Sequence, residues 1–307
     1  MSKLTLVVPT LNAAGYISQF VGGLNRQVRQ PDRVIILDSA STDGSPQLWR
    51  EQGLEVVSIP RGTFDHGGTR NLGARLAGEG ICCFLTQDAV MASPQTLAAL
   101  IEPLEKGQAA ATFGRQLPRP EASPAERYAR YFQYRAASEC RSAQDVPGLG
   151  VRAYRFTNVC SAVRLEKFWA VGGFPERIIL NEDMLLVARL FAAGERVCYV
   201  GAAEVLHSHD YTLKQQFQRH FDIGASFADA AELLRGARVG GEGVRFAVGQ
   251  MGYLVRLGEW RQVPAAVGDL GARMLGFQLG RRHQALPTPL KKKLSMHSYH
   301  WDQKEQR

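Results

Sequence analysis

Acidic residues stand beside one another or beside histidines at several points of the chain. Such groups can move protons or hold a cation. Glu182 and Asp183 directly precede the apolar run "MLLVARLF". A carboxylate at this position can accept a proton from a reacting hydroxyl. It can equally serve the helix, because acids favour a first helical turn and Asn181 is able to cap it. The pair alone does not decide between the two roles.

Other candidate ligands follow apolar stretches. Asp38 ends "RVIILD", and Asp88 follows "CCFLTQ". A carboxylate there can accept from a ribose hydroxyl or a base N–H, or can ligate a hard cation. Turn formation is the alternative, since Asp also starts turns. His207 and His209 alternate in "HSHD". On an extended segment they would point to opposite faces, so one would reach a cation or phosphate while the other packs.

A glycine-rich segment, "DHGGTRNLGAR", could approach an anion. Glycines at a helix start let backbone N–H groups come close to a phosphate, and Arg70 adds a fixed charge. The dinucleotide fingerprint GxGxxG is absent. Gly68 and Gly73 have the GxxxxG spacing, but Ala74 and Arg75 replace the Lys-Ser/Thr of a phosphate-binding loop. The sequence therefore argues against a nucleoside triphosphatase.

The first hundred residues supply a scaffold that can bring these groups together. Apolar runs predict strands at 4–10, 33–39, 54–60 and 81–87. Segments with helical spacing follow them at 13–28, 44–53, 67–80 and 93–107. Repeated strand–helix units form a mostly parallel sheet with helices on both faces, an α/β fold. Ligands of such sheets bind beyond the carboxyl ends of the strands.

The rest of the chain is less regular and ends in helices. We expect a strand within 148–174, a helix at 182–194 and a strand at 196–201. Helices dominate from 213 to about 280, where the amphipathic segment 244–282 predicts a helical hairpin packed on the core. No apolar stretch reaches ~18 uninterrupted residues, so we expect no membrane span.

Composition and charge narrow the class of protein. The chain has 307 residues, of which 45% are apolar and 21% charged, as in globular proteins. The net charge is +8, and residues 281–307 contribute +5 of it. This basic tail suits nucleic acid or an anionic membrane surface, unless it is simply solvated. The five cysteines include no CxxC, which argues against a disulfide framework or zinc site and fits a reducing cytoplasm.

Together these motifs resemble the family 2 glycosyltransferases of the GT-A fold. The matching segments are "VVPTLN", "LDSASTDGS", "HGGTRNLGA", the Asp of "TQDA", and "NED", in the family's order over about residues 4–210. "FDHGGTRN", "GRQLPRP" and "HSHDYTLKQQFQRHFDIG" are most similar to bacterial rhamnosyltransferases, which use dTDP-rhamnose to build surface polysaccharide. The resemblance implies a GT-A domain over 1–212, with a nucleotide-binding half (1–107) and an acceptor half (108–212). A helical C-terminal region with the basic tail would cover 213–307.

The resemblance also implies a site. Asp183 corresponds to the catalytic base, and Glu182 would orient it or bind an acceptor hydroxyl. Asp88 corresponds to the last acid of the DxD metal motif. Thr86 replaces the first acid, so His207 or His209 would complete the shell of a weakly held Mg²⁺ or Mn²⁺ ion. Arg219, in "QFQR", would contact the acceptor or the diphosphate. The nucleotide sugar would contact Pro9, Thr10, Asn12, Asp38, Ser39, His66, Gly67, Arg70, Gln87 and Asp88.

The expected function is an inverting transfer of rhamnose from dTDP-rhamnose to lipopolysaccharide or another cell-surface polysaccharide. The partners would be the nucleotide-sugar donor and a saccharide or lipid-linked saccharide acceptor. We expect a cytoplasmic location with peripheral contact at the inner membrane. One alternative is a catalytically silent sugar-nucleotide-binding module of a polysaccharide-assembly complex. A sugar nucleotidyltransferase would need a basic nucleotide loop, which "VVPTLNAAG" lacks. Nucleic-acid binding is not expected, because no recognition helix or aromatic-basic sheet motif accompanies the charge.

Overall fold

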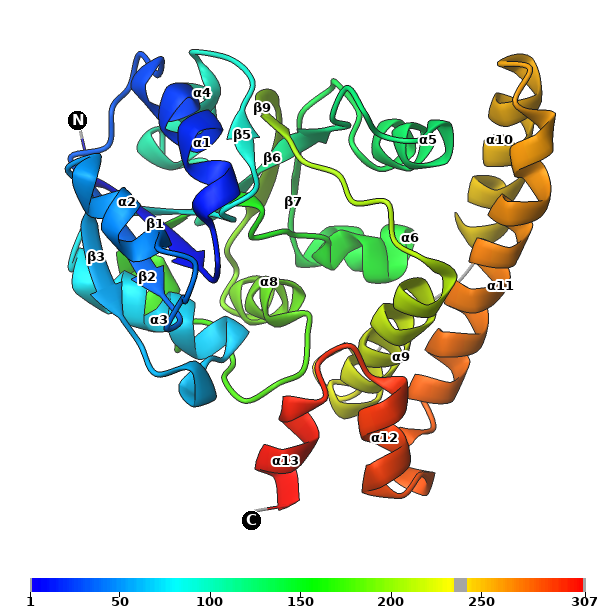
Figure 1. Cartoon of the computed structure of the whole chain (residues 1–307). Helices are drawn as coiled ribbons and strands as arrows, with labels where there is room; N and C mark the ends of the chain where they lie inside the picture. Colours follow the sequence, from blue (N-terminus) through cyan, green and yellow to red (C-terminus); the bar gives the residue numbers. More distant parts are fainter. Residues whose placement is uncertain (1, 235–241, 306–307) are drawn as a thin grey trace.

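The computed structural model describes residues 2–234 and 242–305 (Figure 1). Its strands form one sheet in the order β3-β2-β1-β4-β8-β6-β9-β5, with β7 paired to β9. They are β1 Leu4–Thr10, β2 Arg33–Asp38, β3 Glu55–Ser58, β4 Ile81–Leu85, β5 Val90–Met91, β6 Ala111–Leu117, β7 Glu139–Arg141, β8 Cys160–Arg164 and β9 Val197–Leu206. Arg307, which the sequence places in the basic tail, lies outside the described residues.

The first four strands are parallel, as predicted, and their alternation divides the core into two layers. Leu6 and Val8 of β1 pack with α1 Ile17–Asn25, α2 Ser45–Glu51 and α4 Thr96–Glu105 on one face. Val7 packs with α3 His66–Ala77, α7 Leu165–Ala170 and α8 Glu182–Ala192 on the other. Successive side chains of a strand point to opposite faces, so an apolar run needs cover on both sides. The α/β class with helices on both faces is confirmed.

The second half of the sheet departs from a purely parallel order. β8 is antiparallel to both β4 and β6, whereas β6 and β9 pair in parallel. β6 leads to α5 Pro124–Gln133, and the short α6 Val146–Leu149 precedes β8. β7 pairs with β9 in antiparallel register, with Cys140 directly opposite Cys198. These two cysteines form a disulfide, while the other three are free and buried. The expectation of no disulfide is therefore wrong, because the odd count hides one cross-strand pair.

The C-terminal helices stand along one side of the molecule (Figure 1). They are α9 Leu213–Asp229, α10 Glu242–Arg256, α11 Val263–Gly280, α12 Thr288–Leu294 and α13 Tyr299–Glu305. α9 and α11 cross closely through glycines. A Cβ on Gly276 would lie 2.3 Å from the Phe217 carbonyl oxygen, and one on Gly280 would lie 2.0 Å from that of Phe221. Within the described residues, no helix is both long and apolar enough to cross a membrane.

Candidate active site

The carboxyl ends of β1 and β2 are tied into one polar loop cluster. Asp38 is buried and accepts hydrogen bonds from Thr10 Oγ1 at 3.4 Å and from the Ser41 backbone at 3.0 Å. Ser41 Oγ in turn accepts from the backbone N–H of Asn12 at 2.8 Å. Hydroxyl and carboxylate groups at adjacent strand ends are suited to a nucleoside. The two segments predicted to hold the nucleoside therefore lie side by side.

Further predicted donor residues complete this edge. Pro9 lies opposite Leu37 in the β1–β2 ladder, and the Ser39 backbone donates to the Thr10 carbonyl. The Ser39 hydroxyl is buried and has no hydrogen-bond partner within the described residues. Gln87 clamps the end of β1, because its amide accepts from Leu11 N–H at 2.7 Å and donates to the Leu11 carbonyl at 3.0 Å.

Asp88, His207 and His209 converge on one point beyond β4 and β9. Asp88 Oδ2 lies 3.4 Å from His207 Nε2 and 3.1 Å from His209 Nε2, and the two Nε2 atoms are 3.0 Å apart. We expected alternate histidines to face opposite sides. That expectation is wrong because β9 ends at Leu206, so the strand alternation does not extend to His209. Both histidines therefore join the predicted metal position.

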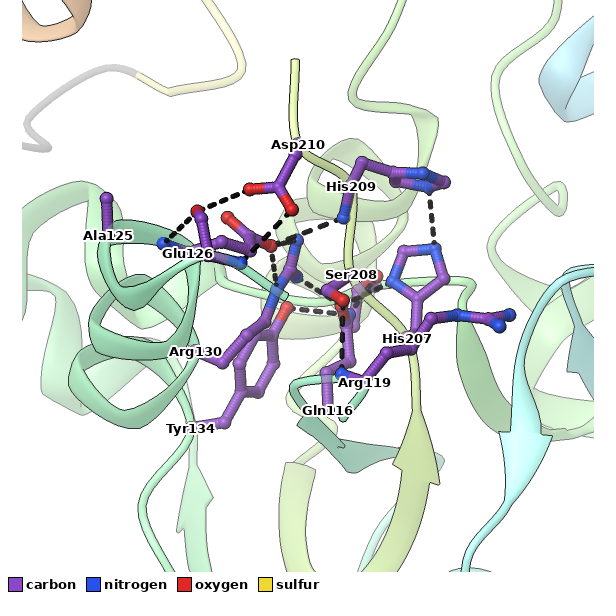
Figure 2. A network of polar contacts seen from close by, with 12 residues as sticks. Gln116, Arg119, Ala125, Glu126, Arg130, Tyr134, His207, Ser208, His209 and Asp210 are labelled. Carbon is purple, nitrogen blue, oxygen red and sulfur yellow. Dashed lines mark hydrogen bonds and ion pairs between the residues drawn. The ribbon is translucent and has the colours of Figure 1, made fainter. Parts of the chain in front are cut away.

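A hydrogen-bond network fixes the orientation of His207 (Figure 2). Gln116 Oε1 lies 2.9 Å from His207 Nδ1 and also accepts from Arg130, while Gln116 Nε2 donates to the Tyr134 hydroxyl. An acceptor at Nδ1 favours the tautomer that leaves the Nε2 lone pair free for a ligand. Arg130 is itself held by Glu126 at 2.6 Å. The network therefore preorganises an imidazole nitrogen toward Asp88.

The three side chains fit a divalent cation. Burial opposes a charged Asp88, yet hydrogen bonds from His207 and His209 hold the pKa of Asp88 well below its usual value. Burial lowers the pKa of His207, which keeps the imidazole neutral. A carboxylate with two neutral imidazoles is a donor set that Mn²⁺ and similar ions accept, whereas Mg²⁺ prefers an all-oxygen shell. The ligand atoms lie within 4.8 Å of one another, so one ion can contact all three.

The N-terminus of α3 is shaped by packing against the loop before α8. Asp65 caps the helix by accepting from Gly68 N–H at 2.6 Å, and it also accepts from Arg177 N–H at 2.9 Å. A Cβ on Gly67 would lie 2.0 Å from the Pro175 carbonyl oxygen. Gly67 is thus required for a close approach of the protein's own backbone. Its predicted contact with a nucleotide sugar stays a prediction.

Glu182 is a buried, ionised partner of Arg70. Its carboxylate accepts from Arg70 Nη1 at 3.0 Å and from Asn158 Nδ2 at 3.1 Å. Burial works against the charge, but Arg70 outweighs it and the pKa of Glu182 is below its usual value. Both side chains of the pair are less than one-tenth exposed. The structure therefore commits Arg70 to Glu182, and its predicted contact with the diphosphate stays a prediction.

Asp183 has the electrostatic character of a base. Burial, and secondly the adjacent Glu182 carboxylate, raise the pKa of Asp183 to about 7. Its Oδ1 accepts only the neighbouring Met184 N–H, at 2.8 Å. Asn181 occupies the N-cap position in a left-handed conformation and its side chain makes no cap hydrogen bond. The expected Asn181 cap is therefore wrong, because with φ at 68° Asn181 serves the turn into α8 instead.

One short segment connects the two sides of the site. Thr86 N–H, two residues before Asp88, donates to the Val159 carbonyl. The preceding Asn158 holds Glu182, as described above. Thr157 Oγ1 in turn accepts from Gln116 Nε2 at 3.3 Å, which joins the segment to the histidine network. Residues 157–159 therefore lie between the carboxylate pair of α8 and the Asp88 cluster.

Strained backbone gathers at the same place. Within the described residues, the non-glycine residues with positive φ are Asn12, Ala40, Arg177 and Asn181. They follow β1, follow β2, or belong to the loop into α8. Such conformations cost about 1–3 kcal/mol each and cluster at functional sites. Their distribution independently marks this edge of the sheet.

Arg219 lies near the C-terminal segment that closes one end of the site. Its guanidinium is 5.7 Å from the centre of the Tyr211 ring. Burial lowers the pKa of His66 to about 4, and the Arg219 charge acts in the same direction. The His297 ring packs edge-on against His66 at 5.1 Å. The chain end therefore packs beside the start of α3, and Arg219 faces that junction.

Sequence reasoning missed several residues that support the site. Gln116 and Asn158 each stand next to a strand end, a position that the strand-end rule could have flagged. Arg119 donates to the Asp88 carbonyl oxygen through Nη2, and its backbone N–H donates to Ser208 Oγ at 3.1 Å. Arg119 thus links the two metal-ligand segments. His297 gave no sequence signal, since its role depends on long-range packing.

We expect Arg70→Met to destabilise the fold by about 3–5 kcal/mol, because it leaves the Glu182 charge buried and unpaired. Urea unfolding measures the change. The exposed pair Lys106–Glu102 provides the control, and Lys106→Met should cost less than ~1 kcal/mol. The double variant Arg70→Met/Glu182→Leu should recover part of the loss. Equal stability of Arg70→Met and the wild type would contradict the pairing.

The sheet order, the converging ligands and the carboxylate pair define a glycosyltransferase of the GT-A fold. Residues 5–168 match the family described as Glycosyl transferase family 2, and the chain belongs to that family.

Relatives match over nearly the whole chain. The O-antigen chain rhamnosyltransferase WbaN of Salmonella anatum is 35% identical over 305 residues, covering 98% of this chain and 96% of that protein. The N-acetylglucosaminyl-diphospho-decaprenol L-rhamnosyltransferase of Mycobacterium tuberculosis is 26% identical over 247 residues, covering 66% of this chain and 75% of that protein. Among solved structures, a Pyrobaculum calidifontis mannosyltransferase in complex with GDP-Man and Mn²⁺ shares the fold, with a TM-score of 0.57 and 20% identity over 97% of this chain and 85% of that one.

Proposed function

We propose that this chain is an inverting rhamnosyltransferase that moves rhamnose from dTDP-rhamnose to a lipopolysaccharide or related polysaccharide acceptor. The full-length similarity to an O-antigen chain rhamnosyltransferase is the observation that carries the sugar and acceptor class. The site supports the chemistry, since a high-pKa carboxylate and a cluster of cation ligands flank the same segment 157–159.

In this mechanism Asp183 accepts the proton of the acceptor hydroxyl as the oxygen attacks the anomeric carbon. A carboxylate with a pKa near neutrality is suited to this role. Glu182 stays ionised against Arg70 and keeps the pKa of Asp183 high. Attack from the side opposite the leaving diphosphate inverts the anomeric carbon. Asp38, Thr10 and Asn12 hold the nucleoside, and Arg219 binds the acceptor or the diphosphate.

Asp88, His207 and His209 would hold the divalent cation. When bound there, it would neutralise charge on the leaving diphosphate. Gln116 keeps the His207 ring in place, and Arg119 ties the Asp88 segment to Ser208. The site is therefore built around the ligands, although one acid of the usual metal motif is replaced by Thr86.

The test is a transfer assay with purified protein, dTDP-rhamnose and a lipopolysaccharide acceptor, alongside a thermal-shift panel of dTDP-, UDP- and GDP-sugars with and without Mn²⁺. A ligand that binds only the native state raises the melting temperature. We expect the largest shift with dTDP-rhamnose and Mn²⁺. A larger shift with another nucleotide would contradict the donor assignment.

We further propose that the outer face of the α10–α11 hairpin lies on an anionic membrane surface. Within the described residues, ten large apolar side chains are more than half exposed, and eight of them lie between residues 244 and 275. Val244, Val248 and Val255 share one face of α10, opposite the buried Phe246. Apolar faces of this kind mark interaction surfaces. The predicted packing on the core therefore holds for only one face of the hairpin.

Charge favours a membrane over a second copy of the chain. Residues 242–294 hold nine Lys/Arg and three acidic side chains. The three acids are bound locally: Glu242 to Arg245, Glu259 to Gln262, and Asp269 to Arg273. A self-complementary contact would oppose like charges, whereas anionic lipids match them. Trp260, 63% exposed between the helices, is suited to the bilayer interface. Charged nucleotide sugars do not cross a bilayer, so we place the enzyme at the cytoplasmic face, where nucleotides are made.

We expect Val248→Asp/Met274→Asp to weaken sedimentation with phosphatidylglycerol vesicles by about tenfold or more, because charges then enter the apolar face. Val28→Asp, at an equally exposed valine of the nucleotide-binding half, should leave it unchanged. Both variants should keep the wild-type melting temperature. If vesicle binding persists and light scattering shows that a dimer has become a monomer, the face joins two copies and the membrane proposal is wrong.

A further inference from the structure

A second polar pocket lies away from the residues of the donor site. It has a volume of about 190 Å³ and lies between α5, β7, the segment around α6, and the start of α10. Pockets for drug-sized ligands are typically ~300–1,000 Å³, so this one suits a smaller group. None of the residues assigned above to the donor, the cation or the base lines it. Five of its lining side chains are arginines: Arg135, Arg141, Arg152, Arg155 and Arg245.

Arg141 is the buried centre of this group. It is 4% exposed, and its Nη1 and Nη2 donate to the carbonyls of Arg152 and Arg155. Its Nε has no hydrogen-bond partner within the described residues. The nearest acid, Glu139, is 3.6 Å away and largely exposed. Burial lowers the pKa of Arg141 to about 10, and the neighbouring Arg155 acts in the same direction. The buried cation is therefore poorly compensated.

The remaining charges leave the pocket positive. Glu242 is shared by Arg152 at 3.3 Å and Arg245 at 3.6 Å. Arg135 and Arg155 make no ion pair with any residue that the structure describes. Two carboxylates thus face five guanidinium groups, an excess of three positive charges. That excess is matched by a multiply charged anion better than by a single carboxylate.

Aromatic rings hold the guanidinium groups in place. Arg141 lies 5.3 Å from the centre of the Phe113 ring, and Arg245 lies 5.6 Å from that of Phe132. Stacking of this kind restricts the planar guanidinium, and its fork of donors matches phosphate oxygens. The arginines are therefore preorganised rather than free on the surface.

We propose that this arginine pocket binds a phosphate or diphosphate group. The group belongs either to a lipid headgroup or to a free anion. A lipid source fits the position of Arg245, which directly follows Val244 of the apolar hairpin face. The inference does not rest on the proposed transfer reaction, because the two sites share no side chain.

The test is calorimetric titration with inorganic diphosphate, without divalent cations so that the Asp88 site contributes little. Wild-type protein should bind, and Arg135→Gln/Arg155→Gln should weaken binding by roughly tenfold to a hundredfold, since each lost charge-assisted hydrogen bond costs this order of affinity. The control Arg26→Gln/Arg50→Gln removes the same charge from two exposed arginines elsewhere and should bind like the wild type. If the Arg155 change lowers the melting temperature, Arg135→Glu alone replaces the double variant.

Vesicles identify the source of the phosphate. If it is a lipid headgroup, the double variant should lose binding to phosphatidic acid vesicles, and free diphosphate should compete with them for wild-type protein. If it is a free anion, only the titration should change. Val248→Asp/Met274→Asp should leave the titration unaltered. The proposal is overturned if wild-type protein does not bind diphosphate, or if the arginine variants bind it with wild-type affinity.

Discussion

Asp183→Asn is expected to lower kcat/KM for sugar transfer by about 10²–10⁴-fold, the usual contribution of a positioned base. Asparagine keeps the oxygen that accepts Met184 N–H, so the start of α8 should stay intact. It cannot accept the proton of the acceptor hydroxyl. Donor binding should be unchanged, because Asp183 acts on the acceptor. The measurement is initial transfer rate with purified protein, together with donor binding by calorimetry.

The matched control is Glu195→Gln, which changes an acid just beyond the other end of α8. It should keep near wild-type turnover. The pH profile gives a second readout: with a pKa of about 7, Asp183 is protonated below neutrality. Wild-type kcat/KM should therefore rise with pH through about 7 and level off above it. Glu182→Gln should move this midpoint to lower pH, because it removes the adjacent negative charge. Near wild-type turnover of Asp183→Asn would instead favour a silent binding module.

Asp88→Ala is expected to lower transfer by about 100-fold or more, because the cation would lose its only carboxylate ligand from this cluster. Mn²⁺ binding, followed by calorimetry in the absence of donor, should weaken in parallel. His207→Ala should act similarly. His209→Ala should have the smaller effect, since His209 is more exposed and makes no bond to Gln116.

Glu79→Ala is the control, because it removes an exposed acid that follows α3. Its Mn²⁺ affinity should equal that of the wild type. A chelator should abolish wild-type transfer, and added Mn²⁺ should restore it. Full activity of the wild type in excess chelator would show that the cluster has another role.

The nucleotide-binding half could be predicted closely from sequence. β1 spans the predicted residues 4–10, and β2 and β4 end within two residues of their predicted ends. Long apolar runs bounded by polar turns leave few other structures for these segments. The second half was harder, because β8 runs antiparallel between β4 and β6, and pairings of this kind depend on partners distant in the chain.

The site divides in the same way. The strand-end rule located Asp38 and Asp88, whereas the pairing of Arg70 with Glu182 joins residues 112 positions apart. No local pattern could show that Arg70 is committed to an internal partner. The histidines were expected to diverge, and they converge because the chain leaves the strand geometry before His209. Local rules thus fail where the backbone becomes irregular, which is also where ligands are held.

The glycine contacts between α9 and α11 have a mechanical consequence. Two helices in backbone contact at Gly276 and Gly280 have no side-chain layer that could slide, so the hairpin and the helix that carries Arg219 move as one body. Whatever surface the hairpin rests on therefore sets the height and tilt at which the catalytic opening is presented. An acceptor sugar must extend to that fixed height to be glycosylated, and the crossing would act as a gauge of how far the acceptor projects.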